Sequence, residues 1–325
     1  MIKSDAIKIL NSFGLRVCAK QLIVIDHIDD IKKLNNQDCK NFFIIGEATN
    51  LIMNEYYDGS IIKVAIDDIV KIDNQTLSIG AGLNWFKLID YCLNHKFYGI
   101  ENLTSIPGTV GAAPVQNIGA YGVEISSFVD SVTCYDFDTK QIQVMSNKEC
   151  KFNYRESIFQ LKNSLILRVN LKFSKEFSPI LSYPSLSDYI VTNNINPSSI
   201  TPKALSNLIK TIREFKLPDP STYPNVGSIF KNPIVKTNSI DSDFLSGHKW
   251  KVSTGLIKLS AAKLIELIID KISIPPTLAI YENHSLVIIN LGDATYSELK
   301  NLISDIQNLV KLSFNINLEI EPKIL

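Results

Sequence analysis

The sequence has no excess of charge of either sign. Its 325 residues contain 33 Lys and Arg against 33 Asp and Glu. Without a net positive field, we expect no binding to nucleic acid or to an anionic membrane surface. No apolar run approaches the ~20 residues of a membrane-spanning helix, and Lys3, Asp5 and Lys8 interrupt the first ten residues, unlike the apolar core of a signal peptide. These absences predict a cytoplasmic protein.

Cysteine and histidine are too few and too widely spaced to predict a metal site or a disulfide framework. The five cysteines are odd in number and never form a CxxC pair, and the four histidines form no HxxxH or HExxH motif. Zinc sites commonly require such spacings. We therefore expect reduced, mostly packed thiols and no bound metal.

The glycine fingerprints of the common nucleotide-binding folds are missing as well. GAGLNW (80–85) supplies G-x-G but has Trp85 where the third glycine of a Rossmann fold belongs. The G-K-[ST] of a phosphate loop does not occur. If the protein binds a dinucleotide, it does so in another fold.

Hydrophobic periodicity predicts an α+β protein with several lobes. Hydrophobic residues make up 45% of the chain, which is enough to bury a core. The expected strands are 42–46, 61–66, 76–82, 131–137, 165–173, 285–291 and 316–321. One expected helix begins at Trp85, and others cover 202–216, 259–271 and 296–310. LPDP (217–220) ends the helix at 202–216 and marks a domain boundary. The order of elements lacks the regular alternation of a doubly wound sheet.

Two segments with little side-chain volume are candidates for phosphate binding. They are IIGEATN (44–50), after an expected strand, and SIPGTVGAAPVQNIGAYGVEI (105–125), which is rich in glycine and poor in charge. Glycine lets backbone amides approach an anion closely. For any single glycine a simple turn is the better interpretation, so the segments are candidates as whole loops.

Ser228, in NVGSIFKNP (225–233), follows a glycine as a nucleophilic serine often does. The G-x-S-x-G elbow is incomplete, because Phe230 stands where the second glycine would be. No histidine base is evident nearby. The alternatives are a helix cap, an ordinary hydrogen bond or a proton donor, and the residues alone favour the two structural interpretations.

Two further charged motifs have both a structural and a functional interpretation. Glu319 and Glu321 are two residues apart in an expected strand, so they would share a face opposite Leu318 and Ile320. Neighbouring carboxylates raise one pKa, which suits a general acid, but charges on an edge strand also discourage aggregation. Arg155 could form a surface ion pair with Glu156 or grip a substrate carboxylate by two hydrogen bonds.

Four motifs together resemble the UDP-N-acetylenolpyruvoylglucosamine reductase family. They are IENLTSIPGTVGAAPVQNIGAYGVEI (100–125), YRESIF (154–159), NVGSIFKNP (225–233) and LEIE (318–321). Their order and spacing agree along essentially the whole chain, starting from NSFGLRVCAK (11–20). Tyr183, in LSYPSL, resembles the subclass in which a tyrosine loop closes over the substrate.

The resemblance implies three lobes. Two N-terminal lobes, 1–66 and 67–218, would form an FAD-binding fold of the vanillyl-alcohol-oxidase/PCMH type. A third α+β lobe, 219–315, would bind the substrate, and the C-terminal strand 316–325 would return toward the active site.

The resemblance also implies the site residues. The catalytic group is Ser228, Arg155 and Glu321. The FAD-binding group is Gly46, Glu47, Ala48, Thr49, Asn50, Leu51, Ile106, Pro107, Gly108, Gly111, Ala112, Gln116, Asn117, Gly119 and Gly122. The substrate-binding group is Tyr121, Tyr154, Tyr183, Arg213, Lys216, Lys231 and Asn232.

The chemistry that the resemblance implies uses FAD as cofactor and NADPH as co-substrate. The flavin would deliver a hydride to C3 of UDP-N-acetylglucosamine enolpyruvate. Arg155 and Glu321 would hold the charge that develops at C2, and Ser228 would protonate C2. The product is UDP-N-acetylmuramate, a peptidoglycan precursor, and we expect a monomer. The alternatives are a catalytically silent flavin-binding protein and a serine hydrolase.

The chain departs from the family pattern at several positions. Ala48 and Thr49 stand where Gly and Ser are usual, and Ala48 fits without strain only if its φ is negative. Ile320 replaces a proline in L-E-P-E, and the gapless alignment makes Glu321 the catalytic match. In the third lobe, AKLIE (262–266) and YENHSLVIIN (281–290) also differ from the usual motifs.

Overall fold

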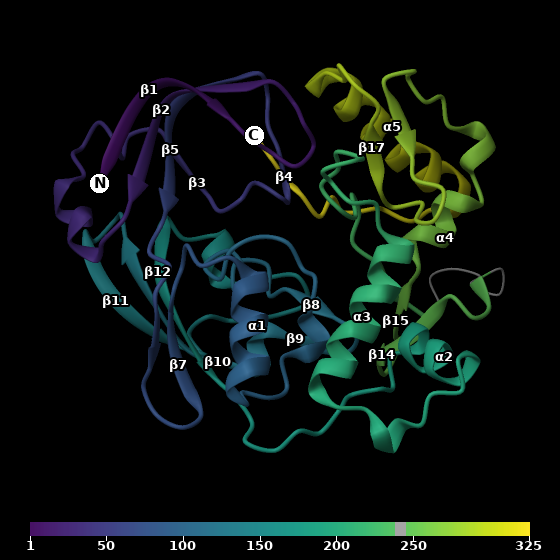
Figure 1. Cartoon of the computed structure of the whole chain (residues 1–325). Helices are drawn as coiled ribbons and strands as arrows, with labels where there is room; N and C mark the ends of the chain where they lie inside the picture. Colours follow the sequence, from purple (N-terminus) through teal and green to yellow (C-terminus); the bar gives the residue numbers. More distant parts are fainter. Residues whose placement is uncertain (238–244) are drawn as a thin grey trace. The chain divides into compact units, whose positions relative to one another are not determined.

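The polypeptide forms two compact units, each built from separated segments of the chain. The computed structural model describes residues 1–237 and 245–325 (Figure 1). Unit 1 comprises Met1–Lys8, Cys18–Glu47 and Asp58–Glu214. Unit 2 comprises Ile9–Val17, Ala48–Tyr57 and Phe215–Leu325. The GEATN segment is therefore divided, with Gly46 and Glu47 in unit 1 and the following residues in unit 2.

Two sheets supply most of the strands of unit 1. The four-stranded sheet has the order β1-β2-β5-β3, in which β3 and β5 are parallel. Its strands are β1 (Ile2–Ile9), β2 (Val17–Ile25), β3 (Phe42–Ile45) and β5 (Tyr56–Val64). The five-stranded sheet is antiparallel, with the order β11-β10-β12-β7-β6. Its strands are β6 (Ile69–Lys71), β7 (Thr76–Gly80), β10 (Val129–Asp136), β11 (Gln141–Ser146) and β12 (Ser164–Lys172).

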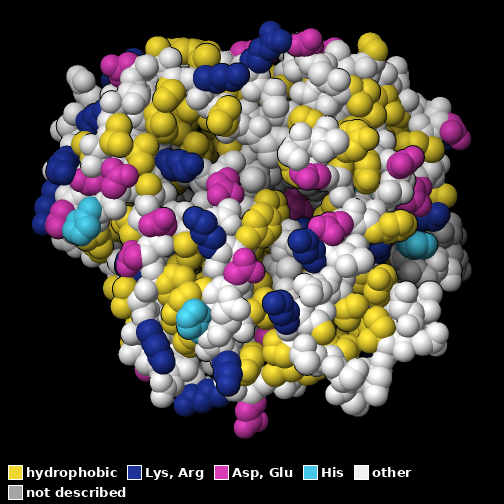
Figure 2. Space-filling model, viewed as in Figure 1, with side chains coloured by type: hydrophobic (Ala, Val, Ile, Leu, Met, Phe, Trp, Pro, Cys, Tyr) yellow, Lys and Arg dark blue, Asp and Glu magenta, His cyan; other side chains and the backbone are white. Residues whose placement is uncertain are grey.

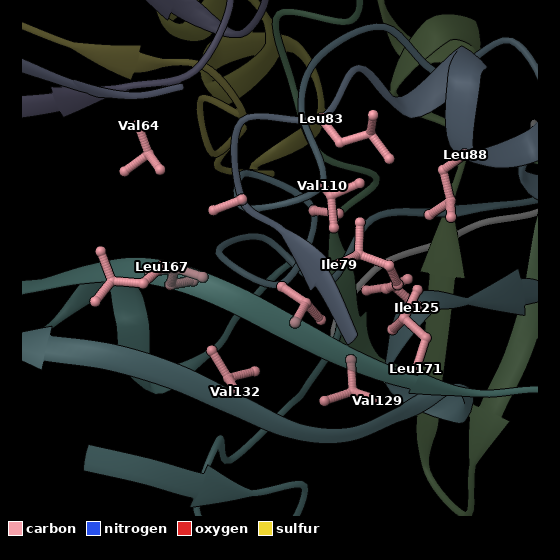
Figure 3. Packing of buried hydrophobic residues seen from close by; sticks show 14 of the residues in the cluster. Val64, Ile79, Leu83, Leu88, Val110, Ile125, Val129, Val132, Leu167 and Leu171 are labelled. Carbon is pink, nitrogen blue, oxygen red and sulfur yellow. The ribbon is translucent and has the colours of Figure 1, made fainter. Parts of the chain in front are cut away.

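Helix α1 (Trp85–His95) contributes to the main core of unit 1. Asn84 caps it by accepting a hydrogen bond from the amide of Phe86, and Lys96 ends it with a left-handed φ of 61°. Its buried side chains join those of β7, β10 and β12 in one cluster. Figure 3 shows Leu88 of α1 together with strand residues such as Ile79 and Leu171.

Close backbone approaches fix the path of the chain after β7. A Cβ at Gly80 would lie 2.3 Å from the carbonyl oxygen of Ile66, and one at Gly82 would lie 2.5 Å from that of Val64. Only glycine permits this contact, because the obstructing atoms belong to the backbone. The chain then turns into α1 and, further on, into the 105–125 segment.

The short hairpin of β8 (Gly119–Ala120) and β9 (Val123–Glu124) shares a second hydrophobic cluster of unit 1 with two helices. The helices are α2 (Pro184–Thr192) and α3 (Pro202–Lys216). Leu205, Ile209 and Ile212 form the buried stripe of α3 and belong to a cluster that includes Tyr121 and residues of α2. This cluster places the tyrosine of the glycine-rich segment against the two helices.

Unit 2 combines small sheets with two helices. The elements are β4 (Leu51–Ile52), β13 (Ile234–Lys236), β14 (Lys249–Ser253), β15 (Leu256–Leu259), α4 (Ala261–Glu266), β16 (Leu278–Ile280), β17 (Ile288–Asn290), α5 (Tyr296–Phe314) and β18 (Lys323–Ile324). A capping box of Thr295 and Glu298 starts α5, and Asn315 ends it in the left-handed region. Strand β18 pairs in parallel with β4, so the C-terminal residues lie beside the segment that follows GEATN.

Several predicted elements are confirmed, and others are wrong in their bounds. The helix at 202–216 has the predicted bounds, but Phe215, expected on its apolar face, is exposed. The helix predicted at 259–271 is α4 alone, followed by a 3-10 turn at Ile269–Lys271, because Ile268 leaves the helical region at φ −121°. The strand predicted at 285–291 is reduced to β17.

The predicted terminal strand 316–321 is also wrong. These residues form an isolated bridge between Ile320 and Phe230, and regular pairing begins only at β18. Pro322 explains the interruption, because it has no amide hydrogen to donate to a ladder. Among the residues that the structure describes, no helix is long and apolar enough to cross a membrane. On the face shown in Figure 2, basic and acidic side chains are interspersed.

Candidate active site

The predicted site residues fall into two groups, one in each unit. Unit 1 contains Arg155, Tyr154, Tyr121, Tyr183 and Arg213, together with the 105–125 segment. Unit 2 contains Ser228, Glu321, Lys231, Asn232 and Lys216, together with residues 48–51. The structure brings residues together within each group.

In unit 2, Ser228 lies on an extended segment that is paired on both sides. Ser228 bridges Val287, and the amide of Ile229 donates to the carbonyl oxygen of Leu286 at 2.9 Å. On the other side, the amide of Glu321 donates to the carbonyl oxygen of Ile229 at 2.8 Å. Main-chain hydrogen bonds therefore place Glu321 beside the residue that follows Ser228. The helix-cap interpretation of Ser228 is not supported, because Ser228 and Phe230 form β-bridges and no helix begins directly after Ser228.

Gly227 is required by its backbone conformation. Its φ is +74°, and a Cβ there would meet no heavy atom within 4 Å. The side chain of Asn225 accepts a hydrogen bond from the amide of Gly227 at 2.9 Å and so holds the bend. The glycine thus gives the chain the turn that presents Ser228.

The two terminal carboxylates have different surroundings. Lys231 Nζ donates to Glu319 Oε1 at 2.5 Å, and the lysine side chain is 10% exposed while that of Glu319 is 69% exposed. The amide of Lys231 also donates to the carbonyl oxygen of Glu319 at 2.9 Å. Glu319 thus forms an ion pair with Lys231, whereas Glu321 is held by a main-chain hydrogen bond from its amide to the residue after Ser228. The neighbouring Asn232 accepts a hydrogen bond from the amide of Ala261 and supports the start of α4.

In unit 1, Arg155 occupies a tight turn with a left-handed backbone. Asn153 and Glu156 exchange two main-chain hydrogen bonds, and Arg155 has a φ of +55°. Arg155 Nη2 donates a hydrogen bond to the carbonyl oxygen of Gly119 at 2.9 Å. The guanidinium carbon lies 5.5 Å from the centre of the Tyr154 ring. These contacts place the cation beside the β8–β9 hairpin.

Two tyrosines and a second arginine form a cluster in the same unit. The rings of Tyr121 and Tyr183 meet edge to face with their centres 5.4 Å apart. Arg213 Nε donates to the carbonyl oxygen of Ser105 at 3.2 Å. Burial lowers the pKa of the Arg213 guanidinium, nearby Tyr121 opposes that shift, and Arg155 adds to it. Burial also raises the pKa of the Tyr121 hydroxyl. An anion bound at Arg213 would oppose the effect of burial and stabilise the charged form of its guanidinium.

The loops predicted to hold a cofactor contact each other within unit 1. A Cβ at Gly46 would lie 2.8 Å from Thr109 Oγ1, and one at Gly111 would lie 2.5 Å from the Cβ of Ala81. Glu47 Oε1 accepts a hydrogen bond from Asn84 Nδ2 at 2.9 Å. Gly46 therefore lets the first loop pack against Thr109 of the second, and Gly111 lets the second loop pack against Ala81. Both loops remain candidates for holding a phosphate-bearing cofactor by their backbone amides.

Sequence reasoning missed two buried polar residues just before the second of these loops. Asn102 Nδ2 donates to the carbonyl oxygens of Tyr121 and Ile180, both at 2.9 Å. Glu101 is buried, one of its oxygens has no hydrogen-bond partner in the described structure, and burial raises the pKa of its carboxyl. The only local signal was their position directly before the glycine-rich segment, because the partner Ile180 is 78 residues away.

Comparison with known proteins gives matches over the whole chain. Residues 219–325 match the family model of the UDP-N-acetylenolpyruvoylglucosamine reductase C-terminal domain, and residues 24–144 match that of an FAD binding domain. The reductase of that name from Pseudoalteromonas translucida is 35% identical over 332 residues, which cover 99% of this chain and 96% of the relative. The reductase from Shewanella sediminis is 34% identical over 334 residues, with 98% and 95% covered. The chain belongs to the UDP-N-acetylenolpyruvoylglucosamine reductase family.

The fold agrees with this membership. The crystal structure of UDP-N-acetylenolpyruvylglucosamine reductase from Thermus caldophilus aligns with a TM-score of 0.70 at 19% identity, over 99% of this chain and 98% of that one. A reductase of this family is an FAD-dependent oxidoreductase, so the predicted cofactor and enzyme class are confirmed. The serine hydrolase alternative is thereby wrong.

The backbone of Ala48 meets the condition under which strain was expected. Its φ is +51°, in the left-handed region. The carbonyl oxygen of Ala48 accepts hydrogen bonds from the amide of Ser12 at 3.3 Å and from its hydroxyl at 3.4 Å, which hold this conformation. A left-handed alanine costs about 1–2 kcal/mol relative to glycine. The loop therefore carries strain that the usual glycine of the family would avoid.

Proposed function

We propose that the chain reduces UDP-N-acetylglucosamine enolpyruvate to UDP-N-acetylmuramate with NADPH, in peptidoglycan precursor synthesis. The observation that carries the proposal is the pairing in unit 2, where main-chain hydrogen bonds hold Ser228 and Glu321 on adjacent extended segments. A proton donor and a carboxylate on neighbouring, hydrogen-bonded segments match the groups that the family motifs imply. FAD, when bound, supplies the hydride that adds to C3 of the enolpyruvyl group.

In this proposal Ser228 supplies the proton. Its Oγ–H bond breaks as a C–H bond forms at C2, so that the alkene gains one hydride and one proton and becomes the lactyl ether. Serine needs no histidine for this role because it acts as an acid rather than as a nucleophile. The rigid pairing of residues 228–230 would hold the hydroxyl in position.

Arg155 and Glu321 stabilise the charge that develops at C2. The planar guanidinium can bind the substrate carboxylate by two hydrogen bonds. The turn at Asn153–Glu156 supports this role, because it holds Arg155 in a defined backbone conformation. Such preorganised groups stabilise a transition state without reorganisation during the reaction.

Tyr121, Tyr183 and Arg213 bind the nucleotide part of the substrate. The edge-to-face contact of the two rings supports a role for Tyr183 as a closing element, since this ring is 44% exposed and Tyr121 only 8%. Lys216 and Asn232 remain substrate-binding candidates. For Lys231 the ion pair with Glu319 supports a second role, which is to hold the terminal segment that carries Glu321.

The test is an anaerobic half-reaction. The purified flavoprotein is first reduced with NADPH, and UDP-N-acetylglucosamine enolpyruvate is then added while flavin absorbance is followed. We expect immediate return of the oxidised flavin spectrum and one equivalent of UDP-N-acetylmuramate. A protein that stays reduced after addition of this substrate would be a silent flavin-binding protein, and the proposal would fail.

A further inference from the structure

We propose that Asn117 and Gly119 position the Arg155 guanidinium and act through it, an inference that rests on the proposed function of Arg155. Both residues lie in the QNIGAYG part of the segment predicted to bind FAD. Within the protein, Asn117 contacts the turn that carries Arg155, and Gly119 contacts the guanidinium itself. All the residues in these contacts belong to unit 1.

The side-chain amide of Asn117 is occupied by the protein. Both of its Nδ2 hydrogens are donated, one to Glu124 Oε2 at 2.8 Å and one to the carbonyl oxygen of Asn153 at 3.0 Å. Its Oδ1 accepts a hydrogen bond from the amide of Ser126 at 3.1 Å. The residue is 1% exposed. Neither N–H group of this side chain is left to donate to a cofactor. The side chain therefore links segments of the protein by hydrogen bonds.

The carbonyl oxygen of Asn153 links Asn117 to the turn that contains Arg155. It accepts from Asn117 Nδ2 and also from the amide of Glu156, the bond that closes the turn. Arg155 lies within that turn at a φ of +55°, a conformation that a non-glycine residue adopts only with outside support. Asn117 provides support by fixing the first residue of the turn.

Gly119 gives the guanidinium room. Its carbonyl oxygen accepts a hydrogen bond from Arg155 Nη2 at 2.9 Å. A Cβ at Gly119 would lie 3.0 Å from Arg155 Nη1, 3.0 Å from the Cγ of Glu124 and 3.1 Å from the carbonyl oxygen of Val123. Gly119 is not among the residues with positive φ, so space and not backbone conformation requires the glycine.

A double-mutant cycle tests the role of Asn117. Asn117→Ala, Arg155→Ala and the double variant are compared for kcat with the enolpyruvyl substrate, for FAD affinity by flavin fluorescence, and for Tm. We expect Asn117→Ala to lower kcat by about 10- to 100-fold, since misplacement of a positioned group by about 1 Å has such effects. The double variant should be no slower than Arg155→Ala, and FAD affinity should stay within about 3-fold of the wild type.

Asn147→Ala is the matched control. Asn147 Nδ2 also donates to two carbonyl oxygens of unit 1, those of Ser126 and Val129, but it does not touch the Arg155 turn. We expect it to lower Tm without lowering kcat. Additive losses of kcat in the double variant would overturn the inference, and so would a tenfold loss of FAD affinity in Asn117→Ala. An Arg155→Ala variant with unchanged kcat would instead refute the proposed function of Arg155.

A thermal cycle tests Gly119 independently of activity. Gly119→Ala should lower Tm less in the Arg155→Ala background than in the wild type, because truncating the arginine removes the contact with Nη1. Part of the loss should remain, because the contacts with Glu124 and with the carbonyl oxygen of Val123 are retained. Equal losses in both backgrounds would mean that the glycine does not serve the guanidinium, and this result stands even if Asn117→Ala fails to fold.

Discussion

The two units hold their proposed catalytic groups in different ways. In unit 2, Ser228 lies on an extended segment fixed by main-chain hydrogen bonds to Leu286 and Glu321. In unit 1, buried asparagine side chains fix the loops, as Asn102 does for Tyr121 and Asn117 does for the Arg155 turn. Main-chain hydrogen bonds depend little on side-chain identity, whereas one substitution removes the hydrogen bonds of an asparagine side chain. A substitution of the proposed catalytic serine in unit 2 should therefore change turnover without changing stability, whereas substitution of an asparagine that holds a loop in unit 1 should change stability.

The largest expected effect is that of Ser228→Ala on turnover. Because main-chain bonds hold residue 228, the variant should keep its Tm and its reduction by NADPH, yet lose turnover by about 100-fold or more if serine is the general acid. Stopped-flow measurement of both half-reactions checks this. Ser260→Ala is the matched control in unit 2, since Ser260 caps α4 and its loss should cost about 1 kcal/mol of stability without lowering turnover. Normal turnover of Ser228→Ala would remove Ser228 from the mechanism.

In unit 1, Asn102→Ala should lower stability, whereas Ser228→Ala in unit 2 should leave it unchanged. Asn102→Ala leaves the carbonyl oxygens of Tyr121 and Ile180 without the donor that joins them, at a cost of about 1–3 kcal/mol in the free energy of unfolding. Urea denaturation measures the loss. The exposed Asn193, which donates to the single carbonyl oxygen of Tyr189, is the control, and Asn193→Ala should change stability by less than about 0.5 kcal/mol. Equal effects of the two variants would contradict the role of the buried tie.

Ala48→Gly should stabilise the protein by about 1 kcal/mol. The substitution relieves the left-handed alanine in the divided GEATN loop. Ala19→Gly, within strand β2, should instead destabilise by about 0.5–1 kcal/mol, as glycine does in a strand interior. Thermal unfolding of the two variants checks the sign, and a destabilised Ala48→Gly would mean that the strain is absent.

The smallest expected effect is a dependence of stability on pH. Burial raises the pKa of Glu101 from its ordinary value of 4.5, so the folded protein favours the protonated form. The stability contributed by this carboxyl is present at low pH and is lost as the pH rises through the raised pKa. The free energy of unfolding of Glu101→Gln should therefore rise relative to that of the wild type as the pH is raised from about 4 to about 8.

Glu149 provides a control of opposite sign. Hydrogen bonds from the hydroxyl and the amide of Ser146 lower its pKa, so its contribution to stability is present above 4.5 and is lost as the pH falls. Glu149→Gln should therefore lose stability relative to the wild type as the pH rises. Urea titrations at several pH values measure both variants, and a difference for Glu101→Gln that is constant with pH would refute the raised pKa.

The elements with strong local signals were predictable from the sequence. The helix at 202–216 has an apolar stripe and a proline stop, and it was predicted with its observed bounds. The predicted strand 316–321 is wrong because β-pairing depends on distant partners that the local sequence does not show, and here only Ile320 forms a bridge, with Phe230. Likewise, contiguous motifs suggested the proposed site residues, but they did not show which groups those residues contact.

The sequence by itself determined the family and the cofactor class, and it pointed to the segments proposed to carry the site, because each depends on short contiguous motifs. The tertiary structure decided which group each residue meets. Lys231 engages Glu319 across 88 residues, and Asn102 reaches Ile180 across 78. It also decided the strained φ of Ala48. Such contacts form only when the folded chain brings distant segments together, and no local pattern encodes them.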